Sequence, residues 1–351
     1  MDSLLKFTED IDDIVRPHGV FDVLLLYGIV APRLKKFLGS KEIASRIWLP
    51  SAGRGVLKRG SDMTPLSVSE LAEAVTPELL EMRSRGELKA VEKDLTEVQR
   101  KVWSYFVPRH LCDLFYATNN EGAGKPIDRI FFDLDRGKGI TADQAAYATK
   151  AFVDIIREDS ELAELLGGRI DPFVSWTGRS FHVFLFLDEK KPAEFYDKYF
   201  QYSKKEPQAT YTGRWVQKLK EEVVFPVSGG HEKVEGILTV DPSQTPSGKL
   251  CRVSLGALHM KDVQTVDGVS IPVTYRMLEK EGIGERLRRY RPEDVIRNLD
   301  KHAGDLPEKF RWKIISFWDI RANLHHFGFF PLISWLLMYE YVQYMTKLCL
   351  L

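Results

Sequence analysis

The sequence has little cysteine and no excess of charge of either sign. Its 351 residues include three cysteines, and 50 basic side chains balance 50 acidic ones, so the formal net charge is zero. The cysteines lie far apart and form no CxxC or CxxH pair, which argues against a structural zinc site and agrees with a reducing compartment. The balanced charge excludes a uniformly basic surface, so any nucleic-acid site must be a local patch.

The sequence also lacks a signal peptide and an uninterrupted apolar span. The first residues, MDSLLKFTEDIDD, are acidic and contain no apolar core of the kind that signal peptides have. Pro331, Glu340, Gln343 and Lys347 interrupt the most apolar segment, 327–351, whereas a membrane-spanning helix needs about 20 apolar residues. We therefore expect a cytoplasmic protein with no membrane partner, in which this segment forms a buried or interface helix. Its apolar end also suggests a truncated further domain.

The sequence does contain 44% hydrophobic residues, which is enough for a buried core. Their pattern changes along the chain: residues 1–100 and 301–351 have helical patterns, whereas residues 101–300 alternate short apolar runs with helical segments. This order predicts an α+β fold. We expect a catalytic domain over 101–300, between an N-terminal, mainly helical region and a C-terminal apolar helical region.

Two aspartates end one predicted strand, 128–135. Because side chains alternate along a strand, Asp133 and Asp135 share one face, where the apolar residues Ile130–Phe132 leave them little solvent. A divalent cation would relieve the repulsion between the two carboxylates, and ligands that are all oxygen suit Mg²⁺ or Mn²⁺. The pattern is short and common, however, and a pair that caps the next helix or faces water is the alternative.

His182 lies at the start of a second predicted strand, 181–187, directly after the polar turn Thr177–Ser180. The Arg179 side chain, the backbone N–H groups of the turn and a protonated His182 would together bind phosphate. A plain β-hairpin with a packed histidine is the alternative.

A site for two metal ions needs a third carboxylate, and Asp241 is the candidate. It ends the short apolar strand 236–240 and can reach Asp133 from a neighbouring strand. Its alternative role is in a turn before Pro242. The residues that follow include four cationic groups that can bind phosphate or form a solvated loop: Lys249, Arg252, His259 and Lys261.

In this order the motifs resemble those of the archaeo-eukaryotic primase superfamily, in particular the archaeal primase catalytic small subunit and plasmid-type primase-polymerases. That family has an acid–apolar–acid motif, then a small–any–His motif, then an apolar–Asp motif. The corresponding residues here are Asp133–Asp135, Ser180–His182 and Val240–Asp241. The turn Gly178–His182 and the basic segment 249–261 are also similar to family segments, and the resemblance covers roughly residues 105–275.

The resemblance implies a primase-type core, in which helices flank a mixed or antiparallel sheet. It implies that the chain makes and extends primers from NTPs or dNTPs on a single-stranded DNA template, with two Mg²⁺ or Mn²⁺ ions held by Asp133, Asp135 and Asp241. It implies six nucleotide-binding residues: Arg179, Ser180, His182, Arg252, His259 and Lys261. It leaves open whether the flanking helical regions position the template, a helicase or a large-subunit-like domain. The expected location is the nucleoid or a replicating plasmid.

The sequence departs from the family in two places. Small-subunit primases often carry a zinc-binding insertion, which three isolated cysteines cannot form, and Ala257 replaces the usual serine before the Leu-His pair. These departures concern how template and nucleotide are handled rather than the three carboxylates.

Three other hypotheses use the same residues. FFDLDRG resembles the nucleophile strand of haloacid-dehalogenase-type phosphatases, in which Asp133 would attack phosphorus. That family has Thr or Val where Gly137 stands, and it has no role for His182. A DxD glycosyltransferase would use the two aspartates for a metal-bound sugar nucleotide. A non-catalytic replication scaffold would need no acids at the three positions.

Overall fold

The chain divides into two compact units, Met1–Pro307 and Glu308–Leu351. A computed structural model describes only residues of the first unit: 20–49, 54–59, 65–79, 92–106, 111–260 and 266–307. The apolar segment 327–351, for which the sequence predicts a helix, therefore lies outside the described residues. Lys261, which the resemblance assigns to nucleotide binding, lies outside them too. Within those residues, no helix is both long and apolar enough to span a bilayer.

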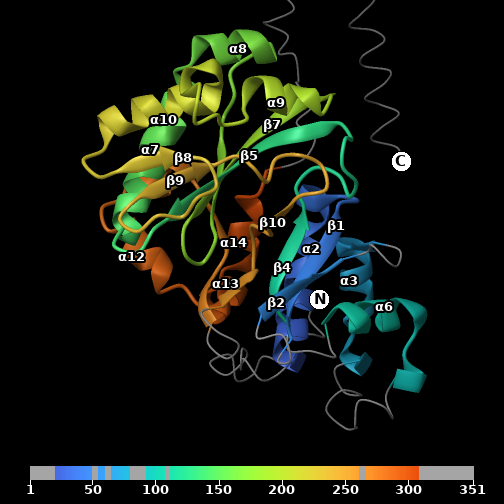
Figure 1. Cartoon of the computed structure of the whole chain (residues 1–351). Helices are drawn as coiled ribbons and strands as arrows, with labels where there is room; N and C mark the ends of the chain where they lie inside the picture. The colour runs from blue at the N-terminus through green and yellow to red at the C-terminus, as the bar shows by residue number, and fades with distance from the viewer. Residues whose placement is uncertain are drawn as a thin grey trace, which may run out of the picture. The chain divides into compact units, whose positions relative to one another are not determined.

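A five-stranded antiparallel sheet contains residues from both sides of the predicted boundary at residue 100 (Figure 1). Its strands are β1 (Glu42–Leu49), β2 (Arg54–Lys58), β3 (Leu66–Ser67), β4 (Leu111–Ala117) and β10 (Leu250–Arg252). They run in the order β10-β4-β1-β2, and β3 pairs with β1. The N-terminal region, for which the sequence predicts mainly helices, thus also supplies three strands, and residue 100 does not separate two folding units.

A six-stranded sheet carries the predicted motifs. Its order is β13-β6-β7-β5-β9-β8, and all pairs are antiparallel except the parallel pair β8–β9. The strands are β5 (Ile127–Arg136), β6 (Phe173–Trp176), β7 (Phe181–Lys191), β8 (Val227–Gly229), β9 (Leu238–Asp241) and β13 (Ile271–Val273). A separate hairpin pairs β11 (Leu258–Met260) with β12 (Val266–Val269). This mixed sheet with flanking helices confirms the predicted α+β class.

Helices surround both sheets. In chain order they are α2 (Val20–Leu38), α3 (Val68–Ala74), α6 (Glu97–Phe106), α7 (Ala142–Arg157), α8 (Ser160–Leu166), α9 (Glu194–Tyr199), α10 (Tyr211–Glu222), α11 (Tyr275–Leu278), α12 (Ile283–Arg288), α13 (Pro292–Arg297) and α14 (Leu299–Gly304). Helix α7 packs against β5 and β7, and α10 and α12 contact it in turn. It begins with a capping box, in which Thr141 and Gln144 accept from each other's backbone N–H.

The alternation of side chains along β5 separates its apolar face from its charged face. Phe132 points toward the helices, with its ring centroid 5.3 Å from that of Phe152 on α7 and 5.8 Å from that of Trp215 on α10. Phe131 and Asp133 point to the other face. One face of the sheet is therefore closed by aromatic packing, and the other carries the polar residues.

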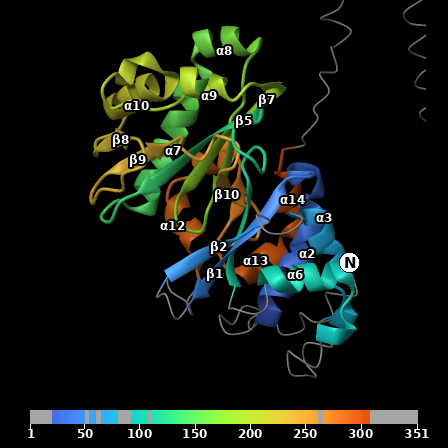
Figure 2. The ribbon, with the colours of Figure 1, turned by 45° about the vertical axis from the view of Figure 1, so that its right-hand side comes forward.

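A buried charged cluster joins the two sheets on that polar face. Arg129 on β5 is fully buried, pairs with Asp128 at 2.7 Å and donates to the Tyr116 hydroxyl on β4 at 3.3 Å. Asp128 also pairs with Lys41 at 3.1 Å. Figure 2 shows β10, which pairs with β4, lying between the strands of the two sheets. The five-stranded sheet can thus contribute residues to the polar face of β5.

Candidate active site

A single row of residues across the six-stranded sheet brings the three motifs together. Asp133 on β5 lies opposite His182 on β7 and, on its other side, opposite Asp241 on β9. Ser175 on β6 continues the row beyond His182. Residues directly opposite in an antiparallel pair share a face, with Cβ atoms about 4.5–5.5 Å apart. The strand register therefore places the predicted catalytic aspartates beside the predicted phosphate-binding histidine.

Asp135 lies on the same face, two residues further along β5, opposite Thr239. Its Oδ2 is 2.8 Å from Lys233 Nζ, and Oδ1 of Asp241 accepts a hydrogen bond from the backbone N–H of Ser243 at 2.8 Å. Within the described part of the chain, no three His, Cys, Asp or Glu side chains gather closely enough to hold a metal ion. The backbone brings the carboxylates to one face, and their joint metal binding stays a prediction.

The ionised form of the Asp133 carboxylate is disfavoured by its surroundings. Burial raises the pKa of Asp133 well above its usual range, and the negative charges of Asp135 and Asp241 raise it further. The positive charges of Lys233 and Arg252 act in the opposite direction. Such a group of oxygen ligands is short of positive charge, and this is the chemistry that fits Mg²⁺ or Mn²⁺.

His182 is buried beside Asp133, with its Nε2 3.7 Å from Asp133 Oδ1 and its ring centroid 4.7 Å from that of Phe131. Burial lowers the pKa of His182 well below its usual value, and the charges of Arg252, Lys233 and His259 lower it further. The imidazole is therefore neutral at neutral pH. Burial and the nearby cations therefore disfavour the protonated form of His182 in the ligand-free protein, and its contact with phosphate stays a prediction.

The turn before His182 is fastened to β5. Thr177 Oγ1 accepts from the Ser180 backbone N–H at 3.0 Å, and the Ser180 hydroxyl donates to the Leu134 carbonyl. Arg136 Nε donates to the Arg179 carbonyl at 2.6 Å. The Ser180 hydroxyl therefore has a structural partner, whereas the Arg179 side chain is exposed. Their contacts with nucleotide stay predictions.

The β11–β12 hairpin packs onto this turn through two glycines. A Cβ on Gly268 would lie 2.2 Å from the Gly178 carbonyl oxygen, and one on Gly178 would lie 2.7 Å from Cβ of His259. Gly178 also has a φ of +92°, which L side chains rarely adopt. This close approach holds His259 beside the turn, and its Nδ1 lies 3.8 Å from Oδ2 of Asp267.

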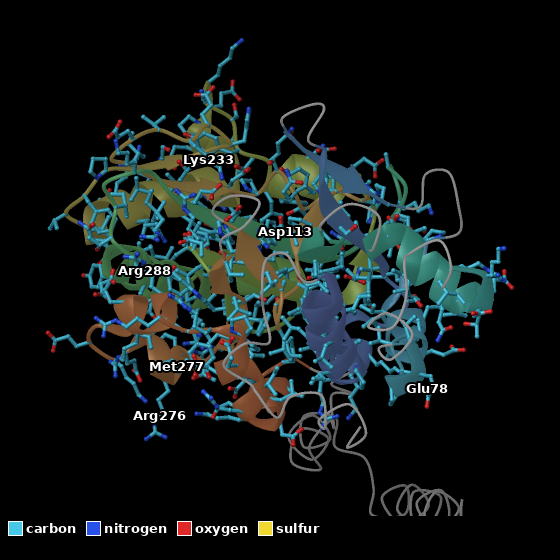
Figure 3. The ribbon with its side chains drawn as sticks, turned by 90° about the horizontal axis from the view of Figure 1, so that it is seen from below. Glu78, Asp113, Lys233, Arg276, Met277 and Arg288 are labelled. Carbon is cyan, nitrogen blue, oxygen red and sulfur yellow. The ribbon has the colours of Figure 1, made fainter. Side chains whose placement is uncertain are left out.

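Arg252 reaches the same region from β10. Its Nη1 is 2.6 Å from Oδ1 of the fully buried Asp113 on β4 and also donates to the Leu258 carbonyl. Its guanidinium lies 5.0 Å from the centroid of the Phe115 ring. The sequence does not single out Asp113, because one acid in the apolar run LCDLFYA has no local signature. Figure 3 labels Asp113 and Lys233, the two site neighbours that sequence analysis missed.

Replacing Asp113 with asparagine should lower the free energy of unfolding by about 2 kcal/mol, because the buried Arg252 loses a charge-assisted hydrogen bond. Urea denaturation followed by circular dichroism would measure this change. The matched control is Asp171→Asn, which breaks the ion pair of Arg157 with an aspartate that is 74% exposed; we expect a change below about 0.5 kcal/mol. Equal losses in the two variants would contradict a supporting role for Asp113.

No protein-family model matches the chain, and no curated protein matches it. Among solved structures, it is similar to the polymerase domain of ligase D from Mycobacterium tuberculosis, solved in complex with DNA. The TM-score is 0.50 and the identity 16%, and the likeness covers 82% of this chain and 92% of that chain. The likeness is one of fold. The α+β class predicted from the sequence is therefore confirmed, and the fold is similar to that of this polymerase domain.

Proposed function

We propose that this protein is a nucleotidyltransferase that synthesises and extends primers from NTPs or dNTPs on a single-stranded DNA template. The row in which Asp133 stands between His182 and Asp241 is the observation that carries this proposal. It puts the three motifs on one face of a sheet whose fold is shared with a polymerase domain. The phosphatase and scaffold hypotheses do not explain why His182 and Asp241, from two other strands, lie beside Asp133.

Asp133, Asp135 and Asp241 would hold two Mg²⁺ or Mn²⁺ ions. The fit rests on their oxygen donors, on their shared face and on the repulsion that the Asp133 carboxylate experiences from the other two. Such ions, when bound, activate the primer 3′-hydroxyl and neutralise the charge on the nucleotide phosphates. In their absence Lys233 supplies positive charge at Asp135.

The cationic side chains around the row would bind the nucleotide. The exposed Arg179 guanidinium offers two parallel donors to a phosphate, and the neutral His182 offers one N–H. His182 Nδ1 is buried with no hydrogen-bond partner among the described residues. Arg252 and His259 would contact phosphate or the template backbone, as would Lys261, which lies outside the described residues. The flanking helical regions would position the template, a helicase or a large-subunit-like partner at the nucleoid or on a plasmid.

A primer-extension assay tests this function directly. The full chain is incubated with Mn²⁺ or Mg²⁺, a single-stranded template, with or without an annealed primer, and each nucleotide set in turn. We expect incorporation that follows the template sequence and weakens as salt rises, because phosphate contacts release counterions. Template-independent products, or none under any of these conditions, would contradict the proposal. Metal-dependent release of phosphate from a phosphomonoester would instead support the phosphatase hypothesis.

A further inference from the structure

The loop between β8 and β9 places a lysine on the carboxylates of the candidate site. Nζ of Lys233 lies 2.8 Å from Oδ2 of Asp135, although 69% of the lysine side chain is exposed to solvent. Its charge also acts on Asp133 and His182, two members of the row. An exposed lysine has many other conformations open to it, so its position over the acidic group calls for an explanation.

The backbone on the C-terminal side of this lysine is fixed to the end of β5. The Gly137 N–H donates to the Ile237 carbonyl at 2.9 Å, and the Gly236 N–H donates to the Lys138 carbonyl at 2.7 Å. A Cβ on Gly137 would lie 2.0 Å from the Val234 carbonyl oxygen, so only glycine allows the loop to approach this closely. The loop is therefore held against the residues that directly follow Asp135 in the chain.

The acidic residues of the same loop do not compete for the lysine. Glu232 pairs with Lys204 at 2.6 Å, and Glu235 lies 3.6 Å from Lys138. The Glu232 carbonyl also accepts from the Thr239 hydroxyl at 3.2 Å, which anchors the loop to β9 on the N-terminal side of the lysine. With both flanks anchored and both neighbouring acids paired elsewhere, the lysine side chain is directed to the carboxylates of the sheet.

We propose that Lys233 neutralises the carboxylates while no metal ion is bound. Once metal ions bind to these carboxylates, its side chain contacts the phosphates of the nucleotide instead. This inference rests on the proposed function. A divalent cation at Asp135 repels the ammonium group, which can move because its stem is flexible and exposed while its backbone stays anchored. The nearest new counter-charge is the phosphate of a nucleotide bound at the same face. A lysine suits this exchange, since its ammonium is a compact charge without a fixed binding geometry.

The exchange predicts two effects of opposite sign for one substitution. Lys233→Met removes a cation that competes with the metal, so the dissociation constant for Mn²⁺ without nucleotide should fall by about 3- to 10-fold. The same variant loses a phosphate contact, so the dissociation constant for a nucleoside triphosphate in saturating Mn²⁺ should rise by about 10-fold. Lys233→Arg keeps the charge and should stay near the wild-type protein in both measurements.

Electron paramagnetic resonance of free Mn²⁺ measures the first constant on the full chain, and fluorescence of a labelled non-hydrolysable triphosphate measures the second. Lys204→Met is the matched control, because Lys204 is 62% exposed and pairs with the same loop but not with the row. Opposite shifts in Lys233→Met that are absent from Lys204→Met would support the inference. Unchanged or weaker Mn²⁺ binding in Lys233→Met, or equal shifts in both variants, would overturn it.

These measurements do not depend on polymerisation. If Lys233→Met shows both shifts and the wild-type protein makes no primer, the exchange stands and the proposed function fails. If the wild-type protein polymerises while Lys233→Met binds Mn²⁺ as tightly as the wild type does, the exchange fails and the proposed function stands. In proteins that carry Asp135→Asn, the dissociation constant for Mn²⁺ should be the same with lysine or methionine at position 233. A difference that persists in these proteins would place the competing contact elsewhere and overturn the inference.

Discussion

Asp133→Asn is expected to lower template-dependent incorporation by about a thousandfold or more, since the variant loses the acid at the centre of the row. Asparagine keeps the shape of the side chain and removes its charge. The assay is primer extension at saturating Mn²⁺, scored as kcat/KM for the incoming nucleotide. Asp188→Asn is the matched control, because Asp188 is exposed near the other end of β7, and it should leave incorporation unchanged.

The same substitution should stabilise the fold at neutral pH. The pKa of Asp133 lies well above its ordinary value of 3.8, so keeping this carboxylate ionised in the folded state opposes folding at pH 7. Near pH 4 and below, the group is protonated in the folded state, and most of this penalty disappears. The melting temperature of Asp133→Asn should therefore exceed that of the wild-type protein at pH 7, and the difference should shrink as the pH falls toward 4.

Melting curves in EDTA between pH 4 and pH 8 measure this difference without bound metal. A variant that is both inactive and more stable separates a functional role from a structural one, because a merely structural residue would lose stability when replaced. Retained incorporation in Asp133→Asn would contradict the proposed function. A lower melting temperature at pH 7 would contradict the repulsion among the three carboxylates.

The sequence predicts the centre of the site because period-two alternation applies to any strand. Asp133 and Asp135 had to share a face once 128–135 was taken as a strand, and the structure has β5 over Ile127–Arg136. Asp241 and His182 lie on either side of Asp133 because of the strand order and register. The periodicity of the sequence alone does not predict either of these. The resemblance supplied the grouping of these residues, and the register is consistent with it.

The rest of the site depends on contacts that leave no local pattern. Lys233 reaches Asp135 only because the loop is hydrogen-bonded to Gly137, and Asp113 matters only because β10 pairs with β4. The N-terminal strands were missed for a similar reason, since β1 gains hydrogen-bond partners from the distant β4, and β2 and β3 pair in turn with β1. Sequence analysis also assigned a charge to His182 that burial and nearby cations oppose.

Gly268→Ala is expected to lower the free energy of unfolding by about 3 kcal/mol, because the new methyl group meets backbone atoms that cannot rotate away. The nearest are the carbonyl oxygen of Gly178 at 2.2 Å and its Cα at 2.8 Å. The hairpin and the turn must separate by about 1 Å to make room, a shift large enough to disturb a reaction geometry. Denaturant unfolding measures the loss of stability.

The separation should also lower incorporation by about 100-fold at temperatures where the variant is fully folded, because it moves His259 away from Arg179 and His182. Gly304→Ala is the control: a Cβ there meets no atom within 4 Å, and alanine in α14 should leave activity unchanged and stability unchanged or higher. If Gly268→Ala loses stability and keeps its nucleotide KM and kcat, the hairpin supports the fold alone. A rise in KM with folding intact would instead show that the contact between hairpin and turn, which holds both His259 and Arg179 in place, supports nucleotide binding.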